Sequence, residues 1–349
     1  MLDDRKLKIL YAIINSYILS AEPIGSRTIT KQYNLGVSSA TIRNEMSDLE
    51  DLGYLNKPHS SAGRIPSDKA YRLYVDELLK LKRTEVNTKK KEDIKRILIK
   101  ESREIDQLLQ NSAKILSAVT SYTALAISPK MKSLKIKHIQ LVPIENKQVL
   151  IVLISDTGVV KNTIFRLQED VSEEQLNTLT NILNDKLRGL TMDQIDDRLS
   201  SEIIREIYDF KNIIDNVIPI INQSIEDIYS VEIYSDGITN ILNFPEYKSI
   251  DKVKNFISFV EDKDLMVDLL SNNSITQDIE LIIGSENVYE PIKDCSLITA
   301  NYRLGDKVIG KIGIIGPTRM DYQKLIEDLY LFSINISEII DMLIGKQYK

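Results

Sequence analysis

The segment from Glu22 to Pro66 constrains this chain more than any other, because it carries the pattern of a helix-turn-helix. Two short stretches with helical spacing flank a four-residue turn, Asn34 to Val37, which contains a glycine. A turn of this length and composition between two helices is typical of that motif. Ser38 or Ser39 is suited to cap the second helix, since a serine hydroxyl can accept a hydrogen bond from a backbone N–H that has no helical partner.

The second helix is expected to bury one face and to present the other to a ligand. Ile42, Met46 and Leu49 recur at helical spacing, and Leu52 is expected to extend this apolar stripe. Small and hydrogen-bonding side chains lie about half a turn away. Such side chains near a helix N-terminus fit the major groove of DNA, because the backbone approaches the bases closely there. These residues are Ala40, Arg43, Asn44 and Ser47.

The residues after the second helix predict a short β-ribbon. Gly53 is expected to end the helix as the glycine that follows its last turn. The segment from Tyr54 to Ile65 then has a polar tip that contains a glycine. A ribbon in this position is the wing of a winged helix, so we expect a winged helix-turn-helix at the N-terminus.

Two separate signatures resemble one family. The run Pro-Ile-Gly-Ser-Arg-Thr from Pro23, the helix Ser-Ser-Ala-Thr-Ile-Arg-Asn-Glu-Met from Ser38 and the wing Ser-Ala-Gly-Arg-Ile-Pro from Ser61 resemble the HrcA family of heat-inducible transcription repressors. The second signature reads Ile-Gly-Ser-Glu-Asn from Ile283 and Gly-Lys-Ile-Gly-Ile-Ile-Gly-Pro-Thr-Arg-Met-Asp-Tyr from Gly310. A helix-turn-helix alone is common, but both signatures in this order extend the resemblance over nearly the whole chain.

The resemblance implies a function and a set of partners. It implies a repressor of chaperone operons that binds double-stranded DNA at an inverted-repeat operator, the CIRCE element, as a homodimer. It also implies that the chaperonin GroEL keeps the repressor active. A regulator of the same build whose sheet domain senses a metabolite is the alternative.

The periodicity predicts an α+β multidomain protein with one antiparallel sheet domain that carries an insertion. Strand patterns between residues 135 and 166 precede a mostly helical block, and strands resume between 277 and 315. Long helices are expected at 92–120, 200–228 and 251–270, with a β-like stretch at 230–243. The resemblance assigns the parts: a winged-helix domain at 1–83, a GAF-like domain at 92–169 and 266–349, and an inserted dimerisation domain at 170–265.

The predicted DNA contacts differ in role. Arg43 and Asn44 are expected to contact base edges, and small neighbours allow close approach. Arg27 and Lys31 are better placed for phosphates, and Arg64 of the wing could reach the minor groove. The full predicted set is Arg27, Lys31, Ser38, Ser39, Ala40, Thr41, Arg43, Asn44, Ser47, His59, Ser60 and Arg64.

Charge is distributed unevenly along the chain. Residues 1–83 contain 13 Lys and Arg and 10 Asp and Glu, whereas the remainder contains 32 basic and 41 acidic residues. A small basic segment on an acidic remainder confines DNA contact to that segment. The lysine-rich stretch from Lys80 to Lys91 is interpreted as a solvated linker rather than as a second DNA-binding patch.

The sequence argues against a membrane, a disulfide and a bound cofactor. No apolar run is long enough to span a bilayer, and the first residues do not form a signal peptide. A single cysteine, Cys295, excludes an internal disulfide and any Cys-x-x-Cys motif, and we expect it to be a small buried hydrophobe. A cytoplasmic protein is expected.

Catalytic motifs are scarce. His59 and His138 are isolated and do not have metal-ligand spacing. The glycines at 310, 313 and 316 lie in a strand pattern and lack the ending of a phosphate-binding loop. An enzyme with a winged-helix regulatory head, such as the biotin-protein ligases, would need a nucleotide-binding motif that the sequence does not contain. We therefore expect no enzyme activity, and we expect Arg319 to form a structural ion pair.

Overall fold

The computed structural model describes residues 2–59, 62–80, 87–128, 135–145, 147–156, 160–167, 171–191, 194, 231–271 and 278–346. The chain forms two compact units. The first contains Met1–Ile127 and Ile233–Ile339, and the second contains Ser128–Glu232 and Ile340–Lys349. Both units combine helices with antiparallel strands, so the predicted α+β class is confirmed.

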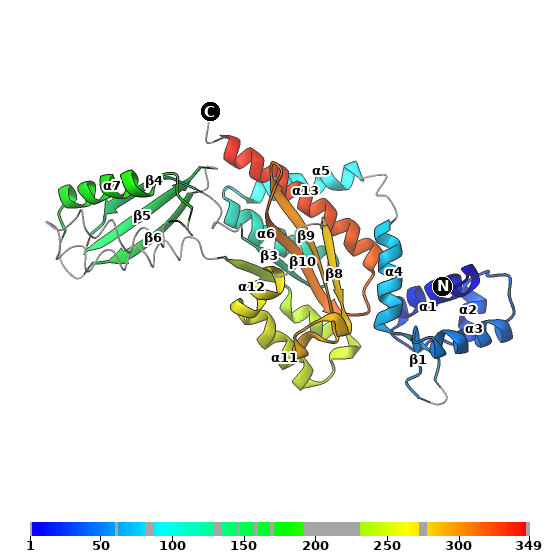
Figure 1. The fold of residues 1–349 in the computed structure, drawn as a ribbon. Coiled ribbons are helices and arrows are strands. Elements are labelled where there is room, and N and C mark those ends of the chain that lie inside the picture. Colours follow the sequence, from blue (N-terminus) through cyan, green and yellow to red (C-terminus); the bar gives the residue numbers. More distant parts are fainter. Residues whose placement is uncertain are drawn as a thin grey trace. The chain divides into compact units, whose positions relative to one another are not determined.

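The first unit begins with a helical segment and a short ribbon, which we call the head (residues 2–66; Figure 1). The two ribbon strands are antiparallel, and a bridge between Ile24 and Arg64 adds a third short segment to them. Fully buried aliphatic side chains from all three helices form the core, among them Ile13, Ile29 and Leu49. The elements of the head are α1 (Asp4–Ser20), α2 (Ser26–Gln32), α3 (Ser39–Asp51), β1 (Leu55–Asn56) and β2 (Ile65–Pro66).

Helix α4 (Asp68–Lys80) follows the head and packs against α1. The ring of Tyr74 meets the ring of Tyr11 edge-on, with the centroids 5.3 Å apart, and the Tyr74 hydroxyl donates a hydrogen bond to Asn15 Oδ1 at 3.2 Å. Because Tyr74 is buried, this aromatic pair and its hydrogen bond join α4 to the head.

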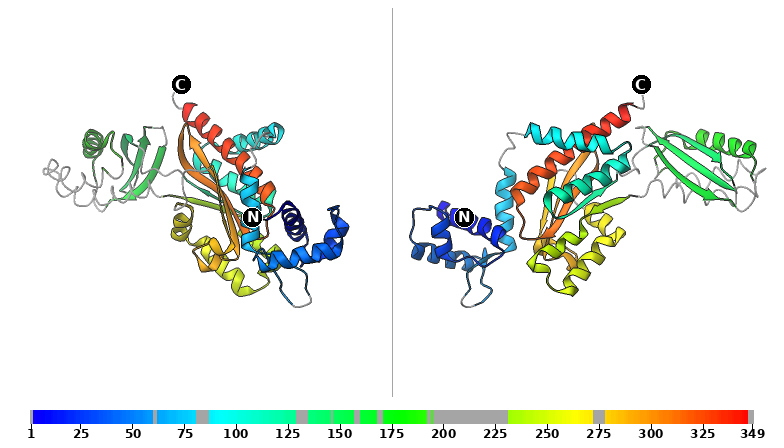
Figure 2. Two further views of the ribbon diagram at one scale, coloured as in Figure 1. Left: turned by 45° about the vertical axis from the view of Figure 1, so that its right-hand side comes forward. Right: turned by 180° about the vertical axis from the view of Figure 1, so that it is seen from behind.

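The rest of the first unit, which we call the body (residues 88–127 and 233–339), is built on a five-stranded antiparallel sheet in the order β7-β3-β10-β9-β8. Helices α5, α6 and α13 cover one face of this sheet (Figure 2). The strands are β3 (Thr123–Ile127), β7 (Ile233–Asp236), β8 (Ile279–Ile283), β9 (Cys295–Leu304) and β10 (Lys307–Pro317). The helices are α5 (Thr88–Glu101), α6 (Ile105–Thr120), α11 (Ile250–Glu261), α12 (Lys263–Ser271), α13 (Tyr322–Lys346) and the short 3₁₀ turns η4 (Ile238–Asn243), η5 (Pro245–Tyr247), η6 (Gly284–Glu286) and η7 (Glu290–Ile292).

The central strands of the body read as apolar runs because side chains on both of their faces are buried. Nearly every residue of β9 and β10 is buried. Gly310 lies beside Tyr302, whose hydroxyl donates to the Ile127 carbonyl at 2.5 Å. A Cβ at Gly310 would lie 2.2 Å from that hydroxyl, so this glycine makes room for the tyrosine. The prediction that these glycines belong to a strand is confirmed.

The second unit contains a separate three-stranded antiparallel sheet, in the order β4-β5-β6, and the helix α7. Side chains of α7 bond to the backbone of β4: Asn184 Oδ1 accepts from the Ile139 N–H at 2.9 Å, and Thr180 Oγ1 accepts from the Leu141 N–H at 3.2 Å. These bonds join the helix to the edge strand. The elements are β4 (Ile136–Pro143), β5 (Gln148–Ser155), β6 (Val160–Arg166) and α7 (Glu173–Leu187).

These units divide the chain at other places than we expected. The strands at 136–166 pair only with one another among the described residues, so they fall in the second unit and not in the body sheet. The second unit therefore begins near residue 128, where we expected 170, and ends near 232, where we expected 265. The helices α11 and α12, which we expected in the inserted domain, belong to the first unit. The helix expected at 200–228 lies outside the described residues.

Several element boundaries also differ. The helix expected at 92–120 is two helices, and Asn111 Nδ2 donates to the Glu101 carbonyl at 2.7 Å where the first one ends. The helix expected at 251–270 is likewise divided, and the strand expected at 230–243 is confined to β7. The strand β3 is absent from the sequence prediction. The interpretation of residues 80–91 as a linker is wrong for its end, because Lys90 and Lys91 lie in α5 and form ion pairs with Asp328 and Glu338 of α13.

Candidate nucleic-acid interface

The N-terminus of α3 is fixed by Ser38, which decides between the two serines suited to cap it. Its hydroxyl accepts a hydrogen bond from the Thr41 N–H at 3.1 Å. Ser39 has another role, because its hydroxyl lies 3.1 Å from that of Ser26 and so joins α3 to α2. The turn between the helices needs its glycine, since Gly36 has a φ of 68°. The predicted turn is therefore confirmed.

The C-terminus of α3 is closed by a glycine turn. Gly53 has a φ of 77°, its N–H donates to the Glu50 carbonyl at 2.8 Å, and the Tyr54 N–H donates to the Leu49 carbonyl at 2.9 Å. This is the two-bond arrangement of a Schellman motif. The prediction for Leu52 is wrong: its side chain is 47% exposed, because the helix has already ended and the chain turns away from the core.

Helix α3 buries one face and exposes the other, as its periodicity predicts. Ile42, Met46 and Leu49 are buried against the head. The opposite side carries small and hydrogen-bonding side chains that are exposed to solvent. We call this set the outer face of α3, and it consists of Ala40, Arg43, Asn44 and Ser47.

Most acidic side chains of α3 are neutralised by cations from neighbouring elements. Lys6 Nζ of α1 lies 2.7 Å from Glu45 Oε2 and 3.0 Å from Asp48 Oδ2. The hydrogen bonds that Lys6 donates to Glu45 and then to Asp48 raise the pKa of Lys6 above its ordinary value, so the lysine remains charged. Arg64 pairs with Glu50 at 2.5 Å. These carboxylates therefore cancel little of the positive charge on the outer face.

Three cations close to the N-terminal half of α3 are exposed and have no such partner. Arg27 and Lys31 lie on α2, and Arg43 lies on the outer face. None of the three forms an ion pair with a residue in the described part of the chain. Exposed guanidinium and ammonium groups without a carboxylate are suited to bind phosphate oxygens or base edges.

The ribbon places its three predicted residues differently. His59 is exposed at the tip, and Ser60 lies outside the described residues. The Arg64 side chain is only 17% exposed, because its guanidinium packs against Glu50 of α3. Gly63 lets the ribbon backbone lie close to Ile24, since a Cβ there would lie 2.5 Å from the Ile24 carbonyl oxygen. In this structure Arg64 therefore holds the ribbon against α3.

One exposed cation of the ribbon is missing from the predicted set. Lys57 follows β1 directly and lies two residues before His59, with its side chain exposed. Its position inside the predicted wing is the sequence signal that could have identified it. Lys69, in contrast, packs over the ring of Tyr54 at 4.4 Å and donates to the Leu52 carbonyl, so it supports the ribbon base.

The residues that we considered for catalysis or ligand binding are a buried cysteine, an exposed strand histidine and an arginine in an ion pair. Cys295 is fully buried beside the Tyr247 hydroxyl, and burial raises the pKa of its thiol to about 12. His138 is an exposed residue of β4, and Arg319 pairs with Glu246 at 2.6 Å, as predicted. Over the part of the chain that the structure describes, no His, Cys, Asp and Glu side chains gather as metal ligands do. No described helix combines the length and apolarity needed to span a membrane.

Comparison with known proteins gives one consistent result. Residues 106–326 match the family model described as the HrcA protein C terminal domain. A heat-inducible transcription repressor HrcA of Alkaliphilus metalliredigens is 44% identical over 339 residues, which cover 97% of this chain and 98% of that protein. The HrcA of Ruminiclostridium cellulolyticum is 45% identical over 340 residues, which cover 94% of each chain.

A solved structure supports the fold. The crystal structure of a hypothetical protein at 2.2 Å resolution superimposes with a TM-score of 0.66 and covers 98% of this chain and all of that one. Its sequence identity is 24%, so it bears on the architecture alone. The family model covers more than half of the chain, and the curated relatives extend the match over both ends. The chain belongs to the HrcA family of heat-inducible transcription repressors.

Proposed function

We propose that this chain is a cytoplasmic transcriptional repressor of heat-shock genes that binds operator DNA through the outer face of α3. The observation that carries the proposal is the contrast within that helix. Three of its four acidic side chains, Glu45, Asp48 and Glu50, are paired with cations, whereas Arg43 and Asn44 are exposed and have small neighbours. The names of the relatives favour repression over the sensing of a metabolite.

The head has the order of elements of a winged helix, with α2 and α3 as the helix-turn-helix and the ribbon as the wing. In this assignment the N-terminal half of α3 enters the major groove. Ala40 and Ser47 let the backbone approach, and Arg43 and Asn44 have the donor geometry that guanine and adenine edges accept. Arg27, Lys31 and Lys57 contact phosphates on either side. Ser38, Ser39 and Thr41 shape the N-terminus that approaches the bases.

One helix reads only a few base pairs, which does not select a site within a genome. A homodimer doubles the recognised length, and its two-fold symmetry requires an inverted-repeat operator. The CIRCE element upstream of chaperone operons is such an operator, by family resemblance. In this scheme the second unit provides the contact between protomers, and the body is the GAF-like domain that carries it.

In this proposal, induction by heat acts through the folding of the repressor itself. Operator occupancy depends on the fraction of chains that are folded and paired, because an incompetent fraction lowers the apparent affinity in proportion. Heat lowers that fraction in a large multidomain protein. The chaperonin restores it while chaperonin is free, and other unfolded clients compete for chaperonin during heat shock.

The test is a comparison of two labelled duplexes at one fixed salt concentration. One contains the inverted repeat, and the other contains the same bases in scrambled order. Fluorescence anisotropy is expected to show affinity for the repeat about 10³-fold or more above that for the scrambled duplex. Equal affinities would contradict the proposal. Selection of bound fragments from genomic DNA would then identify the actual ligand or show that there is none.

A further inference from the structure

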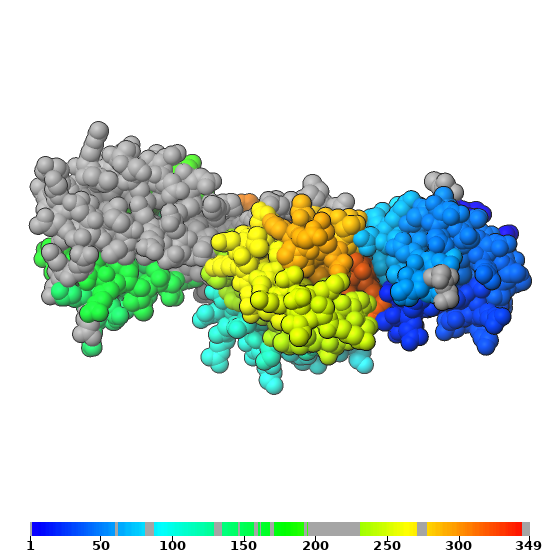
Figure 3. Space-filling model, turned by 90° about the horizontal axis from the view of Figure 1, so that it is seen from below, coloured from blue at the N-terminus to red at the C-terminus, as the bar shows by residue number. Residues whose placement is uncertain are grey.

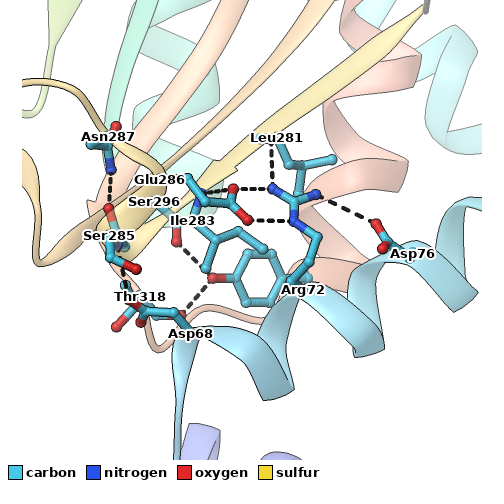
Figure 4. Close-up of polar contacts among 12 residues, drawn as sticks. Asp68, Arg72, Asp76, Leu281, Ile283, Ser285, Glu286, Asn287, Ser296 and Thr318 are labelled. Carbon is cyan, nitrogen blue, oxygen red and sulfur yellow. Dashed lines mark hydrogen bonds and ion pairs between the residues drawn. The ribbon is translucent and has the colours of Figure 1, made fainter. Parts of the chain in front are cut away.

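The second sequence signature lies far from the outer face of α3, and the function proposed above gives it no role. In the structure Ser285 and Glu286 of this signature contact Asp68 and Arg72 of α4 (Figure 4). Residues of the head, of α4 and of the body line a cleft of about 450 Å³. In Figure 3 the blue surface of the head and α4 lies against the orange surface of the body. Buried rings also meet at this boundary, since Tyr71 of α4 lies 5.6 Å from Tyr322 of α13, but charged hydrogen bonds fix direction more closely than such packing does.

The first anchor of this boundary joins α4 to the turn η6. Arg72 Nε donates to Glu286 Oε1 at 2.7 Å, and its Nη2 bonds to both the second oxygen of Glu286 and the Leu281 carbonyl. Asp68 accepts from the Ser285 N–H at 2.8 Å. A two-pronged arginine–carboxylate pair fixes direction as well as distance, because both N–H groups must point at the carboxylate.

The anchor needs Gly284 in a particular conformation. Its φ is 53°, which favours glycine, and a Cβ at this position would lie 2.3 Å from the Asp68 carboxyl carbon. Asn287 fixes the turn from behind, since its Nδ2 donates to the carbonyls of Gly284, Ile292 and Cys295 at 2.8–3.0 Å. The whole Gly-Ser-Glu-Asn run is therefore explained by the docking of α4.

The second anchor joins the body to the end of α1. Arg319 Nε donates to Glu246 Oε1 at 2.6 Å, and its Nη1 donates to the Ile18 carbonyl at 2.6 Å. Ile18 lies in the last turn of α1, whose carbonyls lack helical partners and attract a cation. The two anchors therefore contact different helices, the first α4 and the second α1.

We infer that these two anchors, Arg72–Glu286 with Asp68–Ser285 and Arg319–Glu246 with Ile18, form a latch that fixes the orientation of the head on the body. The inference rests on the proposed function in one respect: in a dimer, the orientation of each head sets the distance between its α3 and that of the partner. The latch therefore determines which spacing of half-sites an operator must have. The outer face of α3 contributes no residue to the latch, so base recognition within one half-site is independent of it.

The test uses paired substitutions that remove each arginine together with the glutamate it faces; Asp76, which also pairs with Arg72, is 48% exposed and stays in contact with solvent. One variant is Arg72→Met with Glu286→Gln, and the other is Arg319→Met with Glu246→Gln. The control is Arg96→Met with Asp93→Asn, an exposed ion pair of α5 at 3.7 Å. Each protein is titrated with inverted repeats whose spacer is changed one base pair at a time, and with a duplex that carries a single half-site.

The wild type and the control are expected to prefer one spacer. The latch variants are expected to lose about tenfold in affinity for that spacer and to bind neighbouring spacers nearly as well, because fewer of their heads are correctly oriented at any moment. Affinity for the single half-site is expected to stay the same. A spacer profile identical to the wild type in both variants would overturn the latch.

A measurement without DNA separates failure of the latch from failure of the proposed function. Spin labels are attached at Asn34→Cys in the head and Asp264→Cys in the body, with labelled chains diluted into unlabelled protein. Cys295 is buried and does not compete for the label. The distance distribution is expected to be narrow in the wild type and broad in the latch variants. Equal widths would overturn the latch whether or not the protein binds an inverted repeat.

Discussion

The outer face of α3 and the latch around α4 are both rich in charged and polar groups, and they use them in opposite ways. Arg43 on α3 is exposed and forms no ion pair with any described residue, whereas Arg72 on α4 contacts a carboxylate and a backbone carbonyl of the body. The carboxylates near the two arginines differ as well. Nearby carboxylates of α3 are already paired with other cations, but Glu286 is aimed at Arg72 by the turn that holds it.

The difference shows how one residue type can serve recognition or architecture within a single unit. An arginine whose hydrogen bonds are already made has little to offer a ligand, because those bonds would first have to break. An exposed arginine without a carboxylate gains most from a phosphate or a base. The contrast predicts that changes at the latch will affect stability and orientation, while changes at the outer face will affect DNA binding alone.

The largest effect on stability is expected for Gly284→Ala. The alanine must adopt a left-handed conformation and displace the Asp68 carboxylate, so we expect a loss of about 2–3 kcal/mol in the free energy of unfolding. Gly305→Ala is the matched control, because Gly305 has a φ of 56° and nothing within 4 Å of an added Cβ. Its expected loss is about 1 kcal/mol. Urea unfolding measures both; equal losses would show that contact with Asp68 is not what demands the glycine.

A smaller effect is expected for the cations of α2. Arg27→Ala and Lys31→Ala should each weaken binding to cognate and scrambled DNA alike, and each should flatten the plot of log affinity against log salt by about one unit. Lys114→Ala on α6 is the control, since Lys114 is exposed but lies in the body. An unchanged salt slope in both α2 variants would remove them from the DNA interface.

The smallest expected effect is on how stability depends on pH, through the Glu286 carboxylate of the latch. Burial raises the pKa of Glu286, but hydrogen bonds from Arg72 and the Ile283 N–H more than offset it, so the net pKa lies below the ordinary value. A lowered pKa in the folded state stabilises the fold above the unfolded pKa, and this contribution disappears as pH falls through the folded pKa. The wild type should therefore lose more stability between pH 7 and pH 3 than Glu286→Gln does.

That difference is expected to be no more than about 1 kcal/mol, because the pair is partly exposed and screened by solvent. Glu290→Gln is the control, since Glu290 is 81% exposed and pairs only with the neighbouring Lys293 among the described residues. If both variants changed the pH dependence equally, the effect would belong to the net charge and not to the latch.

The sequence was informative where structure depends on neighbours in the chain. A serine cap at 38 or 39, the glycine at 53 and the buried stripe of Ile42, Met46 and Leu49 are all local, and each is confirmed, Ser38 being the cap. Base contacts by Arg43 and Asn44 remain a prediction, since the structure holds no DNA. The strand β3 escaped prediction because its five residues are all buried and show no alternation that would distinguish a strand.

The latch and the unit boundaries could not be predicted for a different reason. Arg72 and Glu286 are 214 positions apart, and no periodicity relates them. The signature around Glu286 was visible, but its partner on α4 was not. Likewise, the alternation in β4, β5 and β6 shows that they are strands without showing which sheet they join. Arg64 looked like a free wing cation because its partner, Glu50, lies on another element.

The central claim is that Arg43 reads a base while the fold does not depend on it. The most direct measurement compares the wild type with Arg43→Ala on the cognate operator, on a series of operators with single base changes and on scrambled DNA, together with urea unfolding. We expect the variant to lose about 1–3 kcal/mol on the cognate operator, to become tolerant of substitution at one base position and to unfold at the same urea concentration. An equal loss of affinity for cognate and scrambled DNA would contradict the account.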